Sequence, residues 1–125
     1  MPKQNWTPEQ LADLTDREEL VLVIARADRP PLRVPVWPVT VDDQVFVRSY
    51  RGVTSGWYRG VLAQREQAVA LTDGDVPVFF DSIDASDEVN AVIDEAFLTK
   101  YANDDYRTAM VTPLALDATL RIDPR

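Results

Sequence analysis

An arginine-rich segment that contains no acid is the most distinctive chemical feature of this sequence. Between Gln44 and Arg65 the chain has no aspartate or glutamate, although the whole chain has 13 basic and 21 acidic residues. The four arginines of the segment are Arg48, Arg51, Arg59 and Arg65. A local positive field in an acidic chain favours an anionic ligand, such as a phosphate or a carboxylate.

The loop inside this segment, residues 51–56, joins an expected strand to an expected helix. A helix N-terminus presents free amide groups and a partial positive charge, which suit an anion. Gly52 and Gly56 let a ligand approach the backbone closely, and Ser55 adds a hydroxyl group. Three neighbouring aromatic side chains are able to stack on a planar ring: Tyr50, Trp57 and Tyr58. The loop is therefore a candidate site for an anionic or ring-bearing ligand.

Each of these residues also has a purely structural interpretation. Arg48 is either a ligand contact, a solvated strand residue or the partner of a carboxylate elsewhere in the chain. For Arg51 and Ser55, an anion-binding role and a plain loop-and-cap role fit the pattern equally well. Trp37, between two prolines, is more typical of a core or subunit interface than of a cofactor contact. Four residues share the spacing of a helix face that packs on a core: Trp57, Tyr58, Val61 and Leu62.

The composition excludes several classes of function. The chain has no histidine and no cysteine, which removes the usual zinc ligands, histidine-dependent triads and thiolate chemistry. A formal net charge of −8 argues against nucleic acid and anionic membrane surfaces as partners. The acids around residues 81–88 fit helix capping better than a metal site. The polar N-terminus and the lack of a long apolar run indicate a cytoplasmic protein.

The elements that must position these residues are mostly strands. The length of 125 residues fits a single domain spanning residues 1–125. A helix is expected from Pro8, with Thr7 and Gln10 as a capping box, a second over about residues 55–64, and a third capped by Ser86. Asp42-Asp43 and Asp73-Gly74-Asp75 predict hairpin turns. Six strands are expected: residues 19–25, 34–41, 45–50, 67–72, 76–83 and 113–122. Together they indicate an α+β fold, mainly β, that is an antiparallel six-stranded barrel with flanking helices.

The middle of the chain resembles a known family. The elements that carry the resemblance are the run Val34–Val39 around Trp37, the Asp42-Asp43 turn, the strand from Val45 to Ser49, Gly52, the run Ser55–Tyr58, and Val61-Leu62. They resemble the deazaflavin-dependent nitroreductases, which belong with the split barrels like pyridoxamine-phosphate oxidase. The sequence is more similar still to an uncharacterised bacterial branch of that group, in which arginine-serine and tryptophan-tyrosine-arginine elements recur. The resemblance covers roughly residues 20–83.

What the resemblance implies is a split β-barrel that forms a homodimer and holds FMN or a deazaflavin coenzyme near the subunit interface. It implies six candidate cofactor contacts: Arg48, Ser49, Arg51, Ser55, Trp57 and Tyr58. The ring of such a cofactor would perform hydride chemistry, so the protein would be an oxidoreductase. The sequence assigns no catalytic residue, because Tyr50, Tyr58, an arginine or water would each serve as a proton donor. Two alternatives stay open: a cofactor-free module that binds a small anionic ligand, and a structural dimer.

Overall fold

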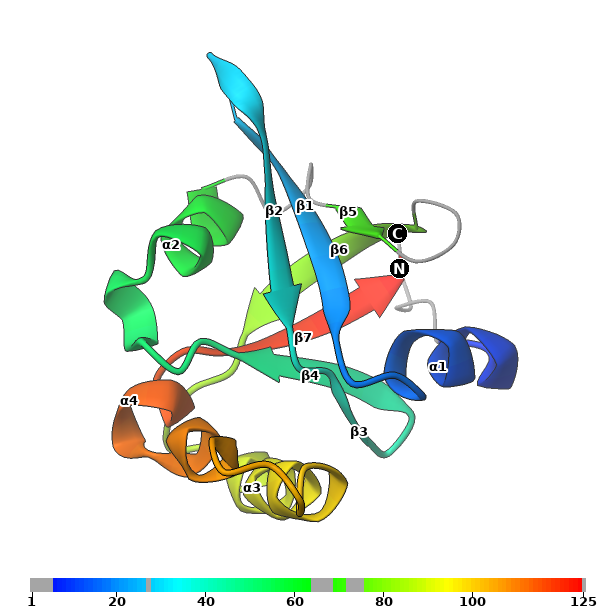
Figure 1. The fold of residues 1–125 in the computed structure, drawn as a ribbon, viewed down its shortest axis with the longest axis vertical. Coiled ribbons are helices and arrows are strands. Elements are labelled where there is room, and N and C mark those ends of the chain that lie inside the picture. The colour runs from blue at the N-terminus through cyan, green and yellow to red at the C-terminus, as the bar shows by residue number, and fades with distance from the viewer. Residues whose placement is uncertain (1–5, 27, 64–68, 72–75, 125) are drawn as a thin grey trace.

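The computed structural model describes residues 6–26, 28–63, 69–71 and 76–124, and these contain seven strands. The strands are β1 (Leu20–Arg26), β2 (Arg29–Val36), β3 (Val39–Val41), β4 (Gln44–Arg48), β5 (Val69–Leu71), β6 (Val76–Ser82) and β7 (Thr119–Pro124). They pair in the order β2-β1-β5-β6-β7-β4-β3, and each of these pairings is antiparallel. The β1–β2 hairpin crosses β7 and β4 steeply, and its far end projects beyond the rest of the sheet (Figure 1). The antiparallel α+β architecture expected from the sequence is therefore confirmed.

Within the described ranges, four α-helices and two short 3-10 helices flank the strands. They are α1 (Pro8–Thr15), α2 (Gly56–Ala63), α3 (Val89–Lys100) and α4 (Pro113–Leu116), with η1 (Gly52–Thr54) and η3 (Arg107–Val111). The capping box of α1 is confirmed, because Gln10 N donates to Thr7 Oγ1 at 3.2 Å and Thr7 N donates to Gln10 Oε1 at 2.9 Å. No helix in the described part of the chain is long and apolar enough to cross a bilayer.

The strand expected over residues 34–41 is divided into two. β2 ends at Val36 and β3 begins at Val39, so the described sheet has seven strands where six were expected. Pro38 has no amide hydrogen, and a ladder cannot continue through it without a missing bond. The turn at Asp42-Asp43 is confirmed: both residues have positive φ, 50° and 63°, as a tight hairpin turn requires. The turn expected at residues 73–75 lies outside the described residues.

Two predicted element starts are corrected. Ser86 does not cap α3; its amide and hydroxyl groups both donate to Asp84 Oδ1, and Asp87 Oδ1 accepts from Val89 N at the start of the helix. The first part of the strand expected over residues 113–122 is the helix α4. Thr112 caps α4 by accepting from Ala115 N, and Pro113 occupies its first turn. Only the later part of that segment forms strand, in β7.

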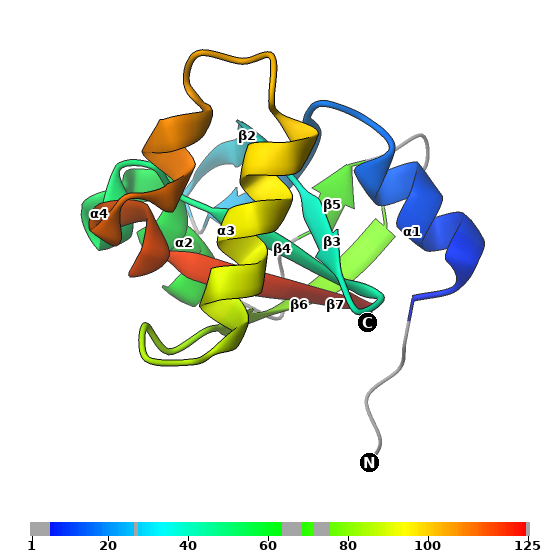
Figure 2. The same ribbon diagram turned by 90° about the horizontal axis from the view of Figure 1, so that it is seen from below.

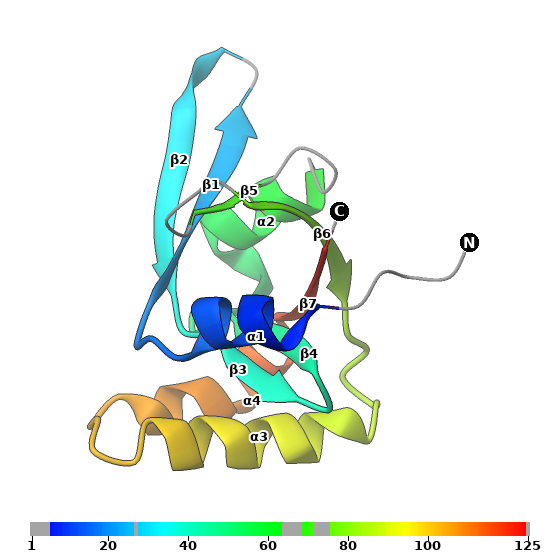
Figure 3. The ribbon, with the colours of Figure 1, turned by 90° about the vertical axis from the view of Figure 1, so that its right-hand side faces the viewer.

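The main core lies between the β1–β2 layer and the strands β4, β6 and β7. Its strand residues are buried and alternate along each strand: Leu20, Leu22, Ile24, Val36, Val45, Val47, Val78, Phe80, Leu120 and Ile122. Helix α1 covers one end of this core with Leu11 and Leu14, and α2 contributes Tyr58 and Val61 (Figure 3). Trp6 ties the start of the described chain to β7 by donating to the carbonyl oxygen of Ile122 at 2.9 Å.

A second layer is formed where α3 packs on the outside of β3 and β4 (Figure 2). Its buried apolar residues are Val39, Val41, Phe46, Ile93, Phe97, Tyr101 and Met110. Strand β4 alternates as the sequence predicts, because Val45 and Val47 belong to the main core and Phe46 belongs to the α3 layer. The same alternation directs Arg48 outward from the main core, toward α3.

Candidate functional site

Arg48 is the most buried charged residue of the described chain, with 1% of its surface exposed. Its guanidinium group has five N–H donors, and the structure directs five hydrogen bonds to protein acceptors. Nε donates to Thr119 Oγ1 at 2.8 Å. Nη1 donates to Asp94 Oδ1 and to the carbonyl oxygen of Met110, and both bonds of Nη2 go to Asn90. A ligand that contacts Arg48 must therefore share donors that are already in use.

The ion pair between Arg48 and Asp94 explains why this charge is tolerated in the interior. An isolated buried guanidinium would lose its hydration without compensation, which costs several kcal/mol. Asp94 supplies the opposite charge from α3, and its side chain keeps 31% of its surface in contact with solvent. Phe97 adds its ring face, 5.6 Å from the guanidinium carbon. Arg48 thus joins β4 to α3, η3 and β7.

An aromatic pocket of about 430 Å³ lies above this network. Arg48 and Met110 form part of its lining, and its wall contains two tryptophans and two tyrosines. The complete lining is Glu19, Pro35, Val36, Trp37, Arg48, Tyr50, Trp57, Tyr106, Ala109 and Met110. Six of these residues belong to β2, β4, α2 and η3, and the other four lie in connections next to β1, β2, β4 and η3: Glu19, Trp37, Tyr50 and Tyr106. We call this cavity the aromatic pocket.

Two of the aromatic side chains are held in place by partners outside the aromatic pocket. Trp37 stacks on Tyr101, with ring centroids 4.0 Å apart and planes 10° apart. Trp57 packs edge-on against Tyr58 at 6.3 Å. Tyr106, in contrast, is 76% exposed at the mouth. The wall at Trp37 and Trp57 is therefore fixed, and the mouth is open.

The mouth of the aromatic pocket also has an exposed cation beside it. Arg51 donates from Nε to the hydroxyl oxygen of Tyr50 at 3.2 Å, and its guanidinium carbon lies 5.5 Å from the centroid of that ring. The backbone then turns at Gly52, whose φ of +79° lies in the left-handed region. A methyl group at this position would lie 2.8 Å from Leu114 Cγ, so Gly52 is required by both its φ and its contact with α4.

The structure gathers some of the six predicted cofactor contacts and separates others. Arg48 and Trp57 line the aromatic pocket, and Arg51 reaches its mouth through Tyr50. Ser49, Ser55 and Tyr58 are buried and are not among its lining residues. The Ser49 hydroxyl has no hydrogen-bond partner within the described residues. The loop-and-cap interpretation of Ser55 is supported, because its carbonyl oxygen accepts from Arg59 N in the first turn of α2.

Sequence reasoning did not identify several residues of the aromatic pocket. Ala109 and Met110 belong to η3, and Tyr106 directly precedes it. The sequence of this segment has neither helical nor strand periodicity, so nothing in it indicates a site. Asp94 of α3, the ion-pair partner of Arg48, was also not identified from the sequence. The available signal was Asn90 and Asp94, two polar groups four residues apart on one helix face that is otherwise apolar.

The described residues contain no group of three carboxylates placed to hold a metal ion. Among the carboxyl groups of the described residues, Asp84 has a clearly lowered pKa, because Ser86 donates to it from both its hydroxyl and its amide group. Both residues are exposed and lie before α3, away from the aromatic pocket. Asp84 therefore stabilises the turn before α3.

Comparison with known proteins identifies the fold and the family. Among solved structures, the crystal structure of Campylobacter jejuni ChuZ matches with a TM-score of 0.71 and 9% sequence identity. The match covers 98% of this chain and 55% of that chain, so this chain spans about half the length of the matched protein, and at this identity the likeness shows the fold alone. No curated protein sequence matches significantly. The family model described as an uncharacterised protein conserved in bacteria, DUF2255, matches residues 10–122. The chain therefore belongs to the DUF2255 family.

Proposed function

We propose that the aromatic pocket binds a flavin-type cofactor, FMN or a deazaflavin coenzyme, and that the protein is an oxidoreductase. The observation that carries this proposal is the pocket itself: about 430 Å³, walled by Trp37, Tyr50, Trp57 and Tyr106. Cofactor sites are concave and mainly apolar, with a few placed polar groups. The resemblance of residues 20–83 to split-barrel flavin and deazaflavin proteins supports the same assignment.

The lining of the aromatic pocket fits a planar ring with an anionic tail. A fused ring system stacks on tryptophan and tyrosine faces, and fixed rings such as Trp37 lose little conformational entropy on binding. Arg51 stands exposed beside Tyr50 at the mouth and offers a fork of donors to a phosphate. Arg48 contributes a positive charge at the floor, which the ion pair with Asp94 largely neutralises. The ring of the cofactor would therefore lie inside the aromatic pocket, and its phosphate would lie outside, beside Arg51.

The protein groups would act mainly by positioning. When bound, the flavin or deazaflavin ring supplies the hydride chemistry. Trp37 and Trp57, which line the pocket, would stack on the ring and exclude water from its inner face. Arg51 would hold the tail, and the Tyr50 hydroxyl, which accepts from Arg51, is the proton donor that this geometry favours.

A homodimer is part of the proposal, and exposed apolar side chains support it. Four of the large exposed apolar residues lie on segments next to the aromatic pocket: Tyr50, Val53, Tyr106 and Leu114. Segments η1 and α4 contact each other, so Val53 and Leu114 belong to neighbouring surfaces. A second copy would cover these side chains and close the mouth. Sedimentation-equilibrium mass determination tests this directly, and a monomer at tens of micromolar would contradict it.

The binding proposal is tested by titrating the purified protein with FMN and, separately, with the deazaflavin coenzyme. The chain has three tryptophans, and two of them line the aromatic pocket, so ring binding should quench much of the intrinsic fluorescence. Arg51→Ala should weaken binding about tenfold or more, as expected for loss of a charge-assisted contact to phosphate. Arg59→Ala is the matched control, because Arg59 is exposed on α2 and does not line the aromatic pocket.

The results separate the proposal from its two alternatives. Saturable binding of either ligand that is weakened by Arg51→Ala and unaffected by Arg59→Ala supports a cofactor-dependent protein. If neither ligand binds at tens of micromolar, the oxidoreductase assignment is abandoned. A small anionic metabolite that raises the melting temperature then indicates a cofactor-free binding module, and strong salt dependence of stability without any ligand effect indicates a structural dimer.

A further inference from the structure

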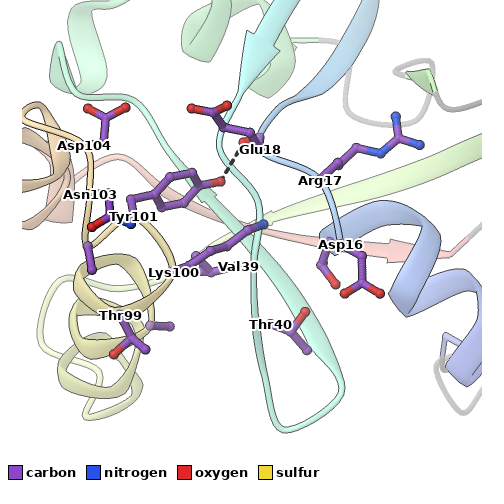
Figure 4. A pocket seen from close by; sticks show the side chains of 13 residues that line it. Asp16, Arg17, Glu18, Val39, Thr40, Thr99, Lys100, Tyr101, Asn103 and Asp104 are labelled. Atoms are coloured by element: carbon purple, nitrogen blue, oxygen red, sulfur yellow. Dashed lines mark hydrogen bonds between the residues drawn. The ribbon is translucent and has the colours of Figure 1, made fainter.

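A second cavity, of about 850 Å³, lies on the other side of the Trp37–Tyr101 stack. It is bounded by the connection between α1 and β1, by β3, and by the end of α3 with the residues that follow. Most of its lining is polar: Thr15, Asp16, Arg17, Glu18, Thr40, Thr99, Lys100, Tyr101, Asn103 and Asp104, with Val39, Ala96 and Ala102. We call it the polar cavity. Figure 4 shows Lys100 extending into it from α3, toward the connection that carries Asp16 and Arg17.

Lys100 is anchored at its tip and is still accessible. Its Nζ donates to the carbonyl oxygen of Pro38, next to β3, while the side chain remains open to solvent. The bond to Pro38 holds the amine in one place at the cavity wall and uses only one of its hydrogens, so the rest of the nitrogen stays available to a molecule in the cavity. An oriented amine in a roomy cavity is the arrangement that nucleophilic lysines require.

The charges around Lys100 act in opposite directions on its protonation. Burial lowers the pKa of Lys100 to about 8, and the carboxylate of Asp16 opposes this lowering. The Tyr101 ring, 5.3 Å from Nζ, also favours the ammonium form. Arg17 is the other cation of the cavity, Glu18 and Asp104 are the other acids, and β3 contributes no charge. The loss of hydration outweighs these attractions, so the fraction of neutral, nucleophilic amine near pH 7 is larger than for an ordinary lysine.

The lining indicates the kind of ligand that the polar cavity accepts. Threonine hydroxyls at positions 40 and 99 and the amide of Asn103 both donate and accept hydrogen bonds. The lining has three carboxylates and only two cations, Arg17 and Lys100, so the surface of the cavity is acidic. Such a surface accepts hydrogen bonds from hydroxyl groups and repels phosphates. These groups suit a small, uncharged, hydroxylated molecule.

We propose that the polar cavity binds a small hydroxylated aldehyde or ketone and that Lys100 forms a Schiff base with its carbonyl group. The lone pair of Nζ attacks the carbonyl carbon, and the carbonyl oxygen takes up a proton to give a carbinolamine. Nitrogen then loses a proton, and the hydroxyl group takes up a second proton from an acid of the cavity and leaves as water, which forms the protonated carbon–nitrogen double bond with no change in oxidation state. The acids of the cavity are able to transfer these protons.

The composition makes this reaction easy to follow, because Lys100 and Lys3 are the only two lysines of the chain. The full-length protein is incubated with glyceraldehyde and cyanoborohydride, which traps the imine as a stable secondary amine, and peptides are quantified by mass spectrometry. An acetylated lysine amide in the same tube is the reference amine. About one tenth of an amine of pKa 8 is neutral at pH 7, against well under about 0.1% at an ordinary lysine pKa. Lys100 should therefore react at least tenfold faster than the reference.

Recognition by the cavity is measured separately from reactivity. The trapping rate at Lys100 should saturate with glyceraldehyde concentration, and glyceraldehyde 3-phosphate should react more slowly because the acids repel it. Asp16→Asn removes a charge that stabilises the ammonium form, so it should speed trapping of formaldehyde at pH 7 by at least twofold. Glu9→Gln, in the first turn of α1 and outside the cavity, is the control for removal of a carboxylate and should leave the rate unchanged.

Three outcomes overturn the proposal. The first is a Lys100 rate equal to that of the reference amine, and the second is a rate that rises linearly with glyceraldehyde without saturation. The third is equal trapping of the neutral and phosphorylated aldehydes. Lys100→Arg keeps the donor to Pro38 but cannot form an imine, so its melting temperature shows that loss of trapping is not loss of folding.

Discussion

Two cavities share the stacked pair of Trp37 and Tyr101 as a wall, yet their chemistry differs. In the aromatic pocket, the charged group at the floor, Arg48, has all its donors directed to protein acceptors. In the polar cavity, the charged group, Lys100, makes one hydrogen bond to the protein and stays accessible. A satisfied charge supports the walls around it, and an incompletely satisfied charge is available for reaction. The number of partners therefore distinguishes a structural cation from a reactive one.

The largest loss of stability is expected from a substitution at the floor of the aromatic pocket. Arg48→Met should lower the free energy of unfolding by about 3 kcal/mol, because Asp94, Asn90 and Thr119 lose the donor that satisfies them. Urea denaturation followed by circular dichroism measures this loss. Arg59→Met makes the same substitution on an exposed helix surface and should change the stability by less than about 0.5 kcal/mol. Equal stabilities of the two variants would refute the structural role of Arg48.

The rim of the aromatic pocket should be the next most sensitive region. Gly52→Ala should cost about 2 kcal/mol, because alanine is strained at a φ of +79° and its methyl group would contact Leu114. Gly56→Ala is the matched control, since a methyl group there meets no atom within 4 Å. Thermal denaturation of both variants measures this difference in stability. A Gly52→Ala protein as stable as Gly56→Ala would show that the rim tolerates a side chain.

The shared wall should show a smaller loss of stability with a distinct pH dependence. Tyr101→Phe keeps the stack with Trp37 but removes the hydroxyl that donates to the carbonyl oxygen of Glu18 at 2.7 Å, a loss of about 1 kcal/mol. Burial, with Glu18 next in effect, raises the pKa of Tyr101 above its ordinary value of 10. The folded protein then retains a proton that the unfolded chain releases, so stability falls as pH rises above 10.

The test of this wall is a comparison of unfolding curves at pH 9 and pH 11. The rise in stability expected from Lys100 below pH 10.5 is common to both proteins, so between pH 9 and pH 11 the wild-type protein should lose stability relative to Tyr101→Phe. The same change in stability in both proteins would mean that Tyr101 does not titrate differently in the folded and unfolded states.

The smallest effect on stability is expected from Lys100 in the polar cavity. The lowered pKa of Lys100, about 8 against 10.5, means that the unfolded chain binds more protons than the folded protein between these values. Stability should therefore rise modestly with pH across this window, and Lys100→Met should abolish the rise. Melting temperatures at pH 7.5 and 9.5 measure it, below the range in which Tyr101 ionises. A rise that persists in Lys100→Met would assign it to another group.

Local signals in the sequence predict the elements well. The capping box at Thr7 and Gln10, the turn at Asp42-Asp43 and the alternation along β4 each involve neighbours within a few residues, and each is confirmed. The signals for α4 were also local, since Thr112 precedes Pro113 in a typical helix start. The apolar residues of segment 113–122 nevertheless indicate a strand, and this indication is wrong for its first part.

The sites depend on contacts that no local pattern contains. Arg48 bonds to Asn90, Asp94, Met110 and Thr119, which are 42 to 71 residues away in the chain. The arginine-rich segment directed attention to the correct end of β4, but which arginine is buried is decided by what α3 places opposite it. Lys100 gave no signal in the sequence, because its environment arises only when α1, β3 and α3 come together.

The network around Arg48 has a consequence for how the folded protein opens. Lifting α3 away from β4 would strip the guanidinium group of Asp94 and Asn90 at once and leave a buried charge with too few acceptors. Detaching η3 or the start of β7 would remove Met110 or Thr119 from the same group. None of these segments is able to fray alone without that penalty. We therefore expect α3, η3 and β7 to exchange their amide hydrogens as one cooperative unit, with a common opening free energy.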